Sequence, residues 1–299
     1  MHEAQQVIDG LMSPREVVLE RSTATGILSL DRCLGGSLPA GAVEIYGGAS
    51  TGKTSLLYRV MAQAQLEEYQ VALCPSEYLD LPYMKAVGVD LSTLPLMGAT
   101  CAEHVFESSL EFLQLDRVVL AFDSVTALRP RRDEPGRWLA LVAQYLEDVA
   151  GCLGRESCVI LVNQVRMHRS VDPSRFFADQ TDSTARKITH WFAARLELSR
   201  SAVSDDQFTM GVNIVANTLA CPCRVQELPF TKGRGVDREL DYLRTWMSSK
   251  PGGWYEIDGQ MIQGEAAAAA RLRENPEDFE NRVSICRKVI NSAQGDCRL

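Results

Sequence analysis

Eight residues near the start of the chain have the spacing of a phosphate-binding loop. Residues 47–54 read GGASTGKT, which matches the pattern G-x-x-x-x-G-K-[ST]. Glycines let such a backbone curl so that its N–H groups face an anion, and the following helix adds its positive N-terminal end. The lysine would reach the β- and γ-phosphates of a nucleotide, and the threonine hydroxyl would ligate Mg²⁺. The alternative is a glycine-rich turn without a ligand. The candidate nucleotide-binding residues are Gly47, Gly48, Ala49, Ser50, Thr51, Gly52, Lys53 and Thr54.

Three further polar residues each follow a short apolar run. Asp123 follows RVVLAF, where a carboxylate could hold the second side of the Mg²⁺ shell. Glu77 follows VALCPS and fits a general base that orients water for hydrolysis. Gln164 ends CVILVNQ, and its amide could sense the γ-phosphate. With Lys53 these form the candidate catalytic set. The alternatives are a strand-end cap, an exposed loop glutamate and an ordinary strand-end amide.

Short apolar runs alternate with helical patterns between residues 42 and 165, which predicts βαβ units and a mainly parallel sheet covered on both faces. We expect strands at 42–46, 71–76, 117–122 and 158–165, and helices at 53–69, 104–115 and 138–152.

The pattern changes twice further along the chain. After residue 195, RLELSRS, FTMGVNIVANT and CRVQELPF predict successive strands, and therefore an antiparallel extension of the sheet. After about residue 236 we expect a small α+β unit with helices at 237–249, 266–273 and 277–292. The segment 254–264 predicts a hairpin that turns at Asp258-Gly259.

Composition narrows the class of protein. The chain has 299 residues, 45% of them hydrophobic and 23% charged, which excludes a disordered chain and predicts one large domain with a smaller one. The net charge of -8 excludes a globally basic nucleic-acid binder but leaves room for a local basic strip. The nine cysteines are read as reduced thiols of a cytoplasmic protein. No transmembrane segment or membrane partner is expected.

At this point the sequence resembles the bacterial RecA recombinase family. The resemblance rests on TGILSLDRCLGGSLPAGAVEIYGGASTGKTSL, then on SEYLDLPYMKAVGVD, VLAFDSVTAL and ILVNQVRM in the same order, and on the tail GGWYEIDGQMIQGEAAAAARLRENPEDFENRV. It implies a RecA-like α/β ATPase core with a mostly parallel twisted sheet, an antiparallel extension and a small α+β C-terminal domain. The implied division is an interface segment at 1–22, the core at 23–235 and the C-terminal domain at 236–299.

The resemblance also implies roles for individual residues. ATP and Mg²⁺ are the implied cofactors, and Gln164 would couple the γ-phosphate to a DNA-binding loop. Asp80 and Tyr83 would contact the adenine, although Tyr83 could equally be a packed aromatic. Two loops, at about 129–137 and 166–187, would hold single-stranded DNA.

Local charge agrees with two DNA-binding loops. The first loop has four arginines against two acids, and the second has five basic residues against three acids. Two phenylalanines of the second loop could stack on bases, or they could dock on a neighbouring segment. The candidate DNA-binding residues are Arg129, Arg131, Arg132, Arg137, Arg166, Arg169, Arg175, Phe176, Phe177, Arg186 and Lys187.

One departure from the family bears on activity. The family has a pair of lysines that reach the ATP of the neighbouring subunit, and Ala216 and Thr218 stand at the matching positions. A cation supplied by a neighbour stabilises the transition state of phosphoryl transfer, as an arginine finger does. We therefore expect a DNA-dependent ATPase with slow or altered hydrolysis, unless Arg224 or another residue substitutes.

Two functions follow from the resemblance. The first is an ATP-dependent recombination and repair protein of the DNA-damage (SOS) response. It would form a filament on single-stranded DNA and promote homologous pairing and strand exchange. The second is a RecA paralogue that acts as an ATP-binding regulatory or adaptor protein in repair or translesion synthesis. It would bind a RecA filament without exchanging strands itself.

Overall fold

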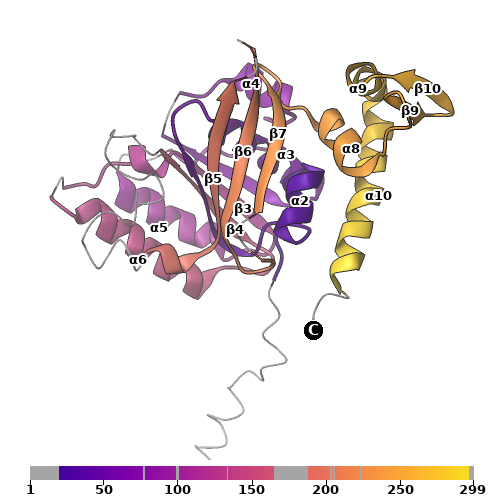
Figure 1. Ribbon diagram of the computed structural model, residues 1–299. Helices are drawn as coiled ribbons and strands as arrows, with labels where there is room; N and C mark the ends of the chain where they lie inside the picture. Colours follow the sequence, from indigo (N-terminus) through magenta and orange to yellow (C-terminus); the bar gives the residue numbers. More distant parts are fainter. Residues whose placement is uncertain are drawn as a thin grey trace, which may run out of the picture.

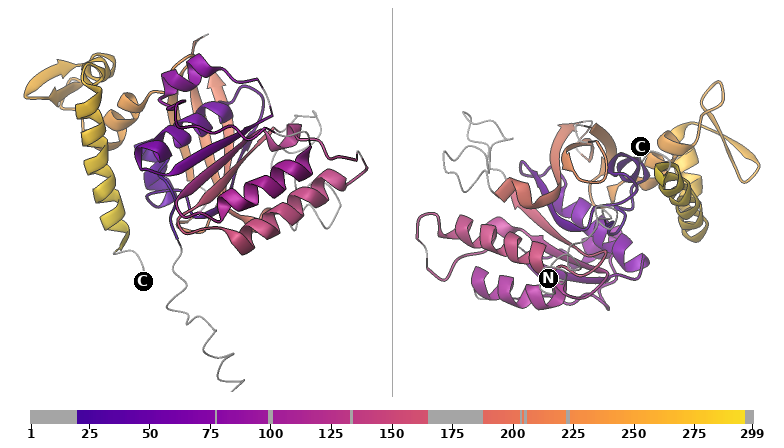
Figure 2. Two further views of the ribbon diagram at one scale, coloured as in Figure 1. Left: turned by 180° about the vertical axis from the view of Figure 1, so that it is seen from behind. Right: turned by 90° about the horizontal axis from the view of Figure 1, so that it is seen from below.

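The computed structural model describes residues 20–76, 78–98, 101–132, 134–164, 188–202, 204, 206–221 and 224–295. A twisted eight-stranded sheet forms the centre, and a separate group of helices and a hairpin lies beside it at the C-terminal end (Figure 1). Figure 2 shows helices on both faces of the parallel part of the sheet. Among the described residues, no helix is long and apolar enough to cross a membrane.

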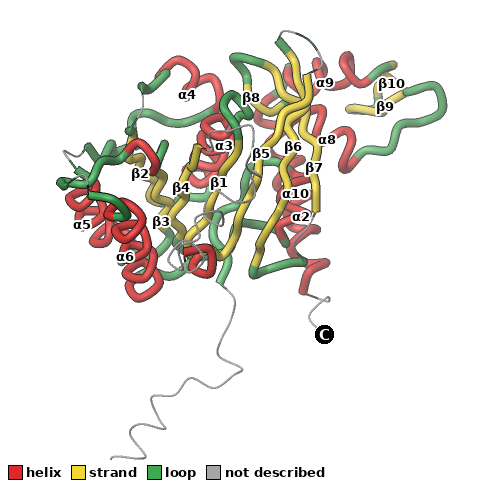
Figure 3. The backbone as a smooth tube through the Cα atoms, turned by 60° about the vertical axis from the view of Figure 1, so that its left-hand side comes forward, coloured by secondary structure: helices red, strands yellow, loops and turns green. Residues whose placement is uncertain are grey.

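The parallel half of the sheet matches the four strands predicted from apolar runs. Its members are β1 (Gly41–Gly47), β2 (Gln70–Pro75), β3 (Val118–Asp123) and β4 (Cys158–Gln164). They lie in the order β2-β3-β4-β1, all parallel (Figure 3). Nearly every residue in these strands is buried, because helices cover both faces of the sheet.

Two hydrophobic clusters hold the helices against the sheet. On one face lie α2 (Leu28–Leu34), α3 (Lys53–Leu66) and α4 (Leu81–Val87). On the other lie α5 (Ala102–Leu113) and α6 (Arg137–Cys152), where the Phe106 and Tyr145 rings stack 4.3 Å apart. The sequence pattern did not predict α2 and α4, which are seven residues each and too short for a clear helical period.

Helix α3 is shorter than expected and more deeply buried. It ends at Leu66 rather than near residue 69, since Glu68 adopts a positive φ of 62° that terminates the helix. Its apolar side packs on the sheet as predicted. However, Tyr58, Arg59 and Gln63 are buried as well. Helix α3 is therefore covered by the sheet on one side and by other segments of the chain on its remaining sides.

The antiparallel extension is confirmed. It consists of β5 (Phe192–Ala202), β6 (Gln207–Asn217), β7 (Arg224–Thr231) and the short β8 (Gly235–Val236). β5 pairs parallel to β1 and antiparallel to β6, so it joins the two halves. Residues alternate along β6: Phe208, Met210, Val212 and Ile214 are buried, and those between them are partly exposed.

The C-terminal segment forms a unit with its own core. It contains α8 (Arg238–Trp246), β9 (Trp254–Ile257), β10 (Gln260–Gln263), α9 (Glu265–Arg273) and α10 (Pro276–Gly295). The hairpin turns at Asp258-Gly259 as predicted, with both residues at positive φ. The first helix ends at Trp246 rather than at residue 249 because Met247 is extended. Leu28 of α2 packs into this core.

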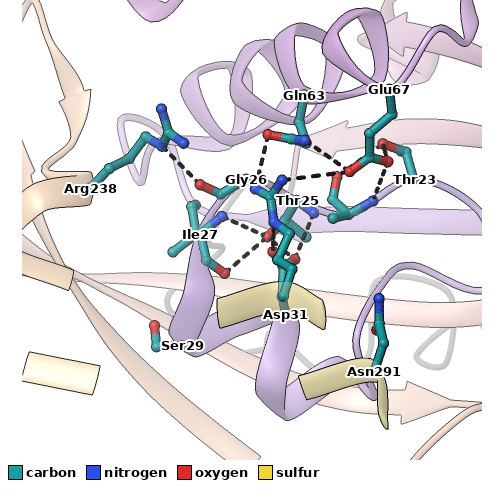
Figure 4. A network of polar contacts seen from close by, with 12 residues as sticks. Thr23, Thr25, Gly26, Ile27, Ser29, Asp31, Gln63, Glu67, Arg238 and Asn291 are labelled. Carbon is teal, nitrogen blue, oxygen red and sulfur yellow. Dashed lines mark hydrogen bonds and ion pairs between the residues drawn. The ribbon is translucent and has the colours of Figure 1, made fainter. Parts of the chain in front are cut away.

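A buried polar network joins this unit to the core (Figure 4). The Asp31 carboxylate accepts hydrogen bonds of 2.6 Å from both the backbone N and the Oγ1 of Thr25, and Arg287 of α10 lies 3.4 Å away. Burial raises the pKa of Asp31, and the nearby Arg287 opposes that rise. The Ser29 backbone N also donates to Asp241 of α8. These contacts place helix α10 against the segment that precedes the phosphate-binding loop.

Candidate nucleotide-binding site and DNA-facing loops

The predicted phosphate-binding loop connects β1 to α3. It begins at the last residue of the strand, Gly47, and runs to the first residues of the helix. At Gly47 the φ is 154°, and an added Cβ would lie 2.3 Å from the Leu198 carbonyl oxygen. At Gly52 the φ is 96°, and a Cβ would lie 2.8 Å from the Met210 sulfur. Both positions therefore require glycine, for backbone conformation and for space.

Lys53 lies folded back over this loop. Its side chain is 8% exposed, and Nζ donates to the Gly48 and Gly47 carbonyls at 2.6 and 3.1 Å. The Thr51 hydroxyl also donates to Gly48 O at 3.0 Å. These bonds hold the ammonium group beside the loop backbone, within the region where the loop N–H groups would meet an anion.

Three neighbouring strands end at one pocket. β3 ends at Asp123, β4 ends at Gln164, and Gln164 pairs in register with Gly47 of β1. The pocket has a volume of about 230 Å³. Its lining residues are Ser50, Thr51, Gly52, Lys53, Thr54, Ser55, Asp123, Ser124, Val162 and Gln164. The structure brings the loop, the acid and the amide together at the carboxyl ends of the parallel strands, as the sequence predicted.

Strand alternation explains why Asp123 faces this pocket. Val119 and Ala121 belong to the cluster on the α3 side of the sheet, so Asp123, two residues further, has the same facing. The same holds for Gln164, which follows Ile160 and Val162 on that side. The carboxylate, 6% exposed in this wall, is a ligand type that suits Mg²⁺.

These residues fit a magnesium nucleotide. Thr54 and Asp123 line the same pocket and would supply a hydroxyl and a carboxylate to the metal, and the pocket volume of about 230 Å³ leaves space for phosphate. Among the described residues, no cluster of three or more His, Cys, Asp or Glu side chains offers another metal site. A nucleotide-bound metal does not need one, because phosphate and water oxygens complete its shell.

The two candidate adenine contacts have local roles of their own. The Asp80 carboxylate caps α4 by accepting from the Tyr83 backbone N at 3.0 Å. The Tyr83 hydroxyl lies 2.6 Å from Ser55 Oγ, one residue beyond the phosphate-binding loop. Burial raises the pKa of the phenol, so it stays protonated. Neither side chain lines the phosphate pocket, and Glu77 lies outside the described residues. Just before it, the Ser76 hydroxyl donates to Ser124 O.

The first candidate DNA loop is tied to α5 through its backbone. The Arg129 carbonyl accepts from Ala102 N at 2.7 Å, and the Arg131 N donates to Glu103 at 2.9 Å. That hydrogen bond is the largest cause of the lowered pKa of Glu103. The side chains of Arg129, Arg131 and Arg132 are exposed. Arg137 is instead the first residue of α6 and pairs with Glu103 at 3.5 Å.

The second candidate DNA loop lies outside the described residues. This applies to Arg166, Arg169, Arg175, Phe176, Phe177, Arg186 and Lys187. The described residues on either side of it are Gln164 and the buried Ile188. The candidate loop, which begins at Arg166, therefore starts two residues beyond a side chain that lines the phosphate pocket.

The two positions that the resemblance matches to lysines of the family, Ala216 and Thr218, lie near the opposite end of the strands from the phosphate-binding loop. β6 runs antiparallel to β5, and Ala216 pairs with Arg195 while Thr218 N donates to the Ala193 carbonyl. In the parallel β1–β5 pair, Ala194 aligns with Val43, close to the start of β1, whereas the phosphate-binding loop follows its end. Both positions therefore lie at the opposite end of the strands from this subunit's phosphate-binding loop. Arg224, the candidate substitute, begins β7.

Sequence reasoning missed a buried polar network across three strands. Glu44 of β1 is 1% exposed and accepts from Arg195 Nε of β5 at 2.7 Å and from Asn163 Nδ2 of β4 at 2.9 Å. Burial raises the pKa of Glu44, and Arg195 and Asn163 oppose that rise. The signal was available, since Glu44 interrupts an otherwise apolar strand. Asn163 directly precedes Gln164.

The fold and the pocket together define a P-loop nucleotide-binding protein with a RecA-like core. Comparison with known proteins gives the family. The RecA N-terminal domain matches residues 10–237, ending at the residue that caps α8.

Among curated relatives, the chain is 33% identical over 285 residues to Protein RecA of Brucella suis, covering 88% of this chain and 78% of that protein. It is 31% identical over 298 residues to Protein RecA of Agrobacterium fabrum, covering 92% and 81%. The chain therefore belongs to the RecA family, whose members are ATP-binding proteins of DNA recombination and repair.

Proposed function

We propose that this protein assembles as an ATP-dependent filament on single-stranded DNA and promotes homologous pairing and strand exchange, with slow hydrolysis. The observation that carries the proposal is the pocket in which the phosphate-binding loop, Asp123 and Gln164 meet, two residues before the second candidate DNA loop. A nucleotide sensor joined directly to a DNA-binding loop supports a switch between two states.

Within one subunit, the residues divide the work of binding. Lys53 would leave its two loop carbonyls to neutralise the β- and γ-phosphates, as the loop N–H groups bind phosphate oxygens. Thr54 and Asp123 would hold Mg²⁺, which supplies charge neutralisation for phosphoryl transfer. Glu77 would orient and deprotonate the attacking water. Asp80 and Tyr83 would receive the adenine.

Coupling to DNA would run through strand β4. Gln164 would donate to the γ-phosphate and so favour one conformation of the loop that follows it, since a ligand shifts an equilibrium only by contacting one state better. Asn163 is fixed to Glu44, so strand β4 has a firm anchor one residue before the sensor. Loss of the γ-phosphate would release the loop and the DNA.

DNA binding would use both loops. Arg129, Arg131 and Arg132 are exposed beside α5, where they can meet phosphates. The second loop would add Arg166, Arg169, Arg175, Arg186 and Lys187, with Phe176 and Phe177 stacking on bases. A locally basic interface suits a chain of net charge -8, because only the DNA-facing strip needs to be positive.

One observation favours a second candidate function. With Ala216 and Thr218 in place of the family's lysines, a neighbouring subunit lacks the cations that would complete the ATP site. The protein would then be an ATP-binding regulatory or adaptor paralogue in DNA repair, the SOS response or translesion synthesis. It would bind a RecA filament without exchanging strands itself.

ATP hydrolysis, measured with and without single-stranded DNA over a range of protein concentrations, separates the two functions. The filament proposal expects DNA to stimulate hydrolysis with a cooperative dependence on protein concentration, because sites form between subunits. A strand-exchange assay at a saturating concentration should then give joint molecules. A flat rate with intact ATP binding, and no joint molecules, would instead establish the adaptor.

A further inference from the structure

The end of strand β4, which carries Gln164, is paired with a neighbouring strand on one side only. β4 pairs with β3 as far as Leu161, opposite Phe122, but it pairs with β1 as far as Gln164, opposite Gly47. Beyond Leu161, the backbone ladder therefore runs to β1 alone. Strand ends with few backbone hydrogen bonds open more readily than the middle of a sheet. A fixed position for the Gln164 side chain thus needs a further restraint.

Asn163 supplies a side-chain restraint on the opposite face of the sheet. Because successive side chains of a strand alternate, Asn163 lies with Leu161 on the side covered by α5 and α6, whereas Gln164 lies on the α3 side. Asn163 is 1% exposed and does not line the phosphate pocket. Its Nδ2 donates to Glu44 Oε1 at 2.9 Å. Since Tyr46 is the residue opposite Asn163, this bond runs diagonally to a residue further back along β1.

Glu44 is itself held from the other side. Arg195 of β5 lies directly opposite it in the β1–β5 pair, and Arg195 Nε donates to Glu44 Oε2 at 2.7 Å. The same guanidinium lies 5.1 Å from the centre of the Tyr46 ring. The two carboxylate oxygens thus accept from two different strands, one oxygen for each. Hydrogen bonds to an ionised carboxylate are shorter and stronger than neutral ones, so Glu44 is a firm point of attachment for the end of β4.

The orientation of the Asn163 amide depends on this one bond. Its Oδ1 atom is buried and has no hydrogen-bond partner among the described residues. An ionised carboxylate only accepts hydrogen bonds, so the amide must present its Nδ2 to Glu44. Within the described part of the chain, no other hydrogen bond holds the Asn163 side chain.

We infer that Asn163, oriented by Glu44, is a positioning residue for Gln164 and so determines how strongly the pocket distinguishes ATP from ADP. The inference rests on the proposed role of Gln164 as the γ-phosphate sensor. Asn163 would act through the backbone that it shares with Gln164, because its side chain lies on the other face of the sheet. A displaced Gln164 amide would lose its hydrogen bond to the γ-phosphate. The phosphate-binding loop would still bind the β-phosphate, which both nucleotides carry.

The ratio of the dissociation constants for ADP and ATP tests this role. It is measured by fluorescence titration with labelled ADP and with a labelled β,γ-imido analogue of ATP, which is not hydrolysed. In Asn163→Leu we expect the preference for the ATP analogue to fall about tenfold, the loss expected for a hydrogen bond to a charged group. The affinity for ADP should stay unchanged. Gln164→Met provides the reference for complete loss of the sensor.

Two further variants separate positioning from a general weakening of the sheet. Asn213→Leu is the matched control, because Asn213 Nδ2 also donates to a carboxylate of β5, that of Glu197 at 3.1 Å, but Asn213 does not line the pocket. It should keep the wild-type preference. Glu44→Gln should keep it as well. Its carbonyl can still accept from Arg195, and the free Oδ1 of Asn163 can accept from its amide once the Asn163 amide turns over.

The outcomes distinguish this inference from the proposed function. A wild-type preference in Asn163→Leu, together with a loss in Gln164→Met, would overturn the role of Asn163 and leave the sensor in place. An unchanged preference in Gln164→Met would refute the sensor and the inference with it. An equal loss in Asn213→Leu, or a loss in Glu44→Gln, would contradict the orientation of the Asn163 amide as the cause. Should Asn163→Leu not fold, Asn163→Ala replaces it with the same expectations.

Discussion

The two ends of the strands in the central sheet differ in how they match the residues that the resemblance to the RecA family implies. At the carboxyl ends of the parallel strands, one pocket is lined by Lys53, Thr54, Asp123 and Gln164. Near the opposite end of these strands, where β6 ends, lie Ala216 and Thr218, which the resemblance matches to two lysines of the family. In the proposed function, the first group would bind the subunit's own nucleotide, and the second would face a neighbour's.

We propose that this difference separates binding from catalysis. ATP and Mg²⁺ would need only the residues of one pocket, whereas fast hydrolysis would also need charge that arrives when subunits meet. The protein would then use ATP as an assembly signal while turning it over slowly. Substitutions at each end of the strands test that separation.

Removing the Lys53 ammonium should abolish the function of the nucleotide pocket at the carboxyl ends of the parallel strands. In Lys53→Ala we expect hydrolysis to fall at least about 1,000-fold, since the cation that stabilises the β- and γ-phosphates is lost. ATP binding, followed with a fluorescent analogue, should weaken with it. Circular dichroism should be unchanged, and Lys288→Ala on the exposed side of α10 is the matched control. Full ATP affinity in Lys53→Ala would refute the assigned pocket.

Placing lysines at residues 216 and 218 should raise the rate of ATP hydrolysis. Ala216→Lys with Thr218→Lys is expected to increase DNA-stimulated hydrolysis by about 10- to 1,000-fold, because a cation from a neighbour stabilises the transition state. The trans origin can be checked by mixing subunits. A chain that carries both lysines together with Lys53→Ala should stimulate wild-type subunits, although it hydrolyses nothing itself. Failure of the mixture to respond would place the lysines' effect within one subunit.

Glu44 lies within strand β1, between the two ends of the sheet's strands. It should make the free energy of unfolding depend on pH. Its pKa is raised by burial, so the native state binds more protons than the unfolded state. Stability is therefore lost as pH rises from the unfolded value near 4.5 through the higher native value, by about 1.4 kcal/mol for each unit of pKa difference. Urea unfolding of wild type and Glu44→Gln at several pH values measures this. The free-energy difference, wild type minus variant, should fall with rising pH.

The exposed carboxylate of Glu227 on β7 provides the control for that experiment. Glu227→Gln should leave the slope of stability against pH as in wild type. A wild-type curve parallel to that of Glu44→Gln would show that the Glu44 carboxyl binds protons equally in both states.

The smallest effect concerns the first DNA loop. Arg132→Ala should reduce the salt slope of single-stranded DNA binding by about 0.7, the value for one phosphate contact on a single strand. Arg137→Ala should change it less, because that guanidinium already pairs with Glu103. Filter binding at a series of salt concentrations measures both. A larger effect for Arg137 would mean that its ion pair opens on DNA.

Much of the fold could be predicted from the sequence, and particular residues show why. The four buried strands are continuous apolar runs, and the phosphate-binding loop has a fixed spacing between a strand and a helix, so both depend on neighbours in the chain. The hairpin at Asp258-Gly259 is equally local. Helices α2 and α4 were missed because seven residues carry too little periodicity, and the ends of α3 and α8 depend on single backbone angles.

The candidate site divides in the same way. Asp123 and Gln164 were predicted because each ends a recognisable apolar run, and Lys53 because it belongs to the loop after another; parallel strands bring their carboxyl ends together. The contacts of Asp80 and Tyr83 with α4 and Ser55 were not predicted, nor was the Glu103 partner of Arg137. Glu44 was overlooked because its partners, Asn163 and Arg195, are 119 and 151 residues away in the chain.

The sequence by itself determined the phosphate-binding loop, the alternation of strands and helices and the family, because these depend on local spacing and on the order of motifs. Only the tertiary structure decided that Arg59, the seventh residue of helix α3, is buried with unpaired donors beside a cavity. Only the tertiary structure also decided that Lys53 and Ala216 lie at opposite ends of the sheet's strands. Both facts arise from strand direction and from packing between distant segments, which no local pattern encodes.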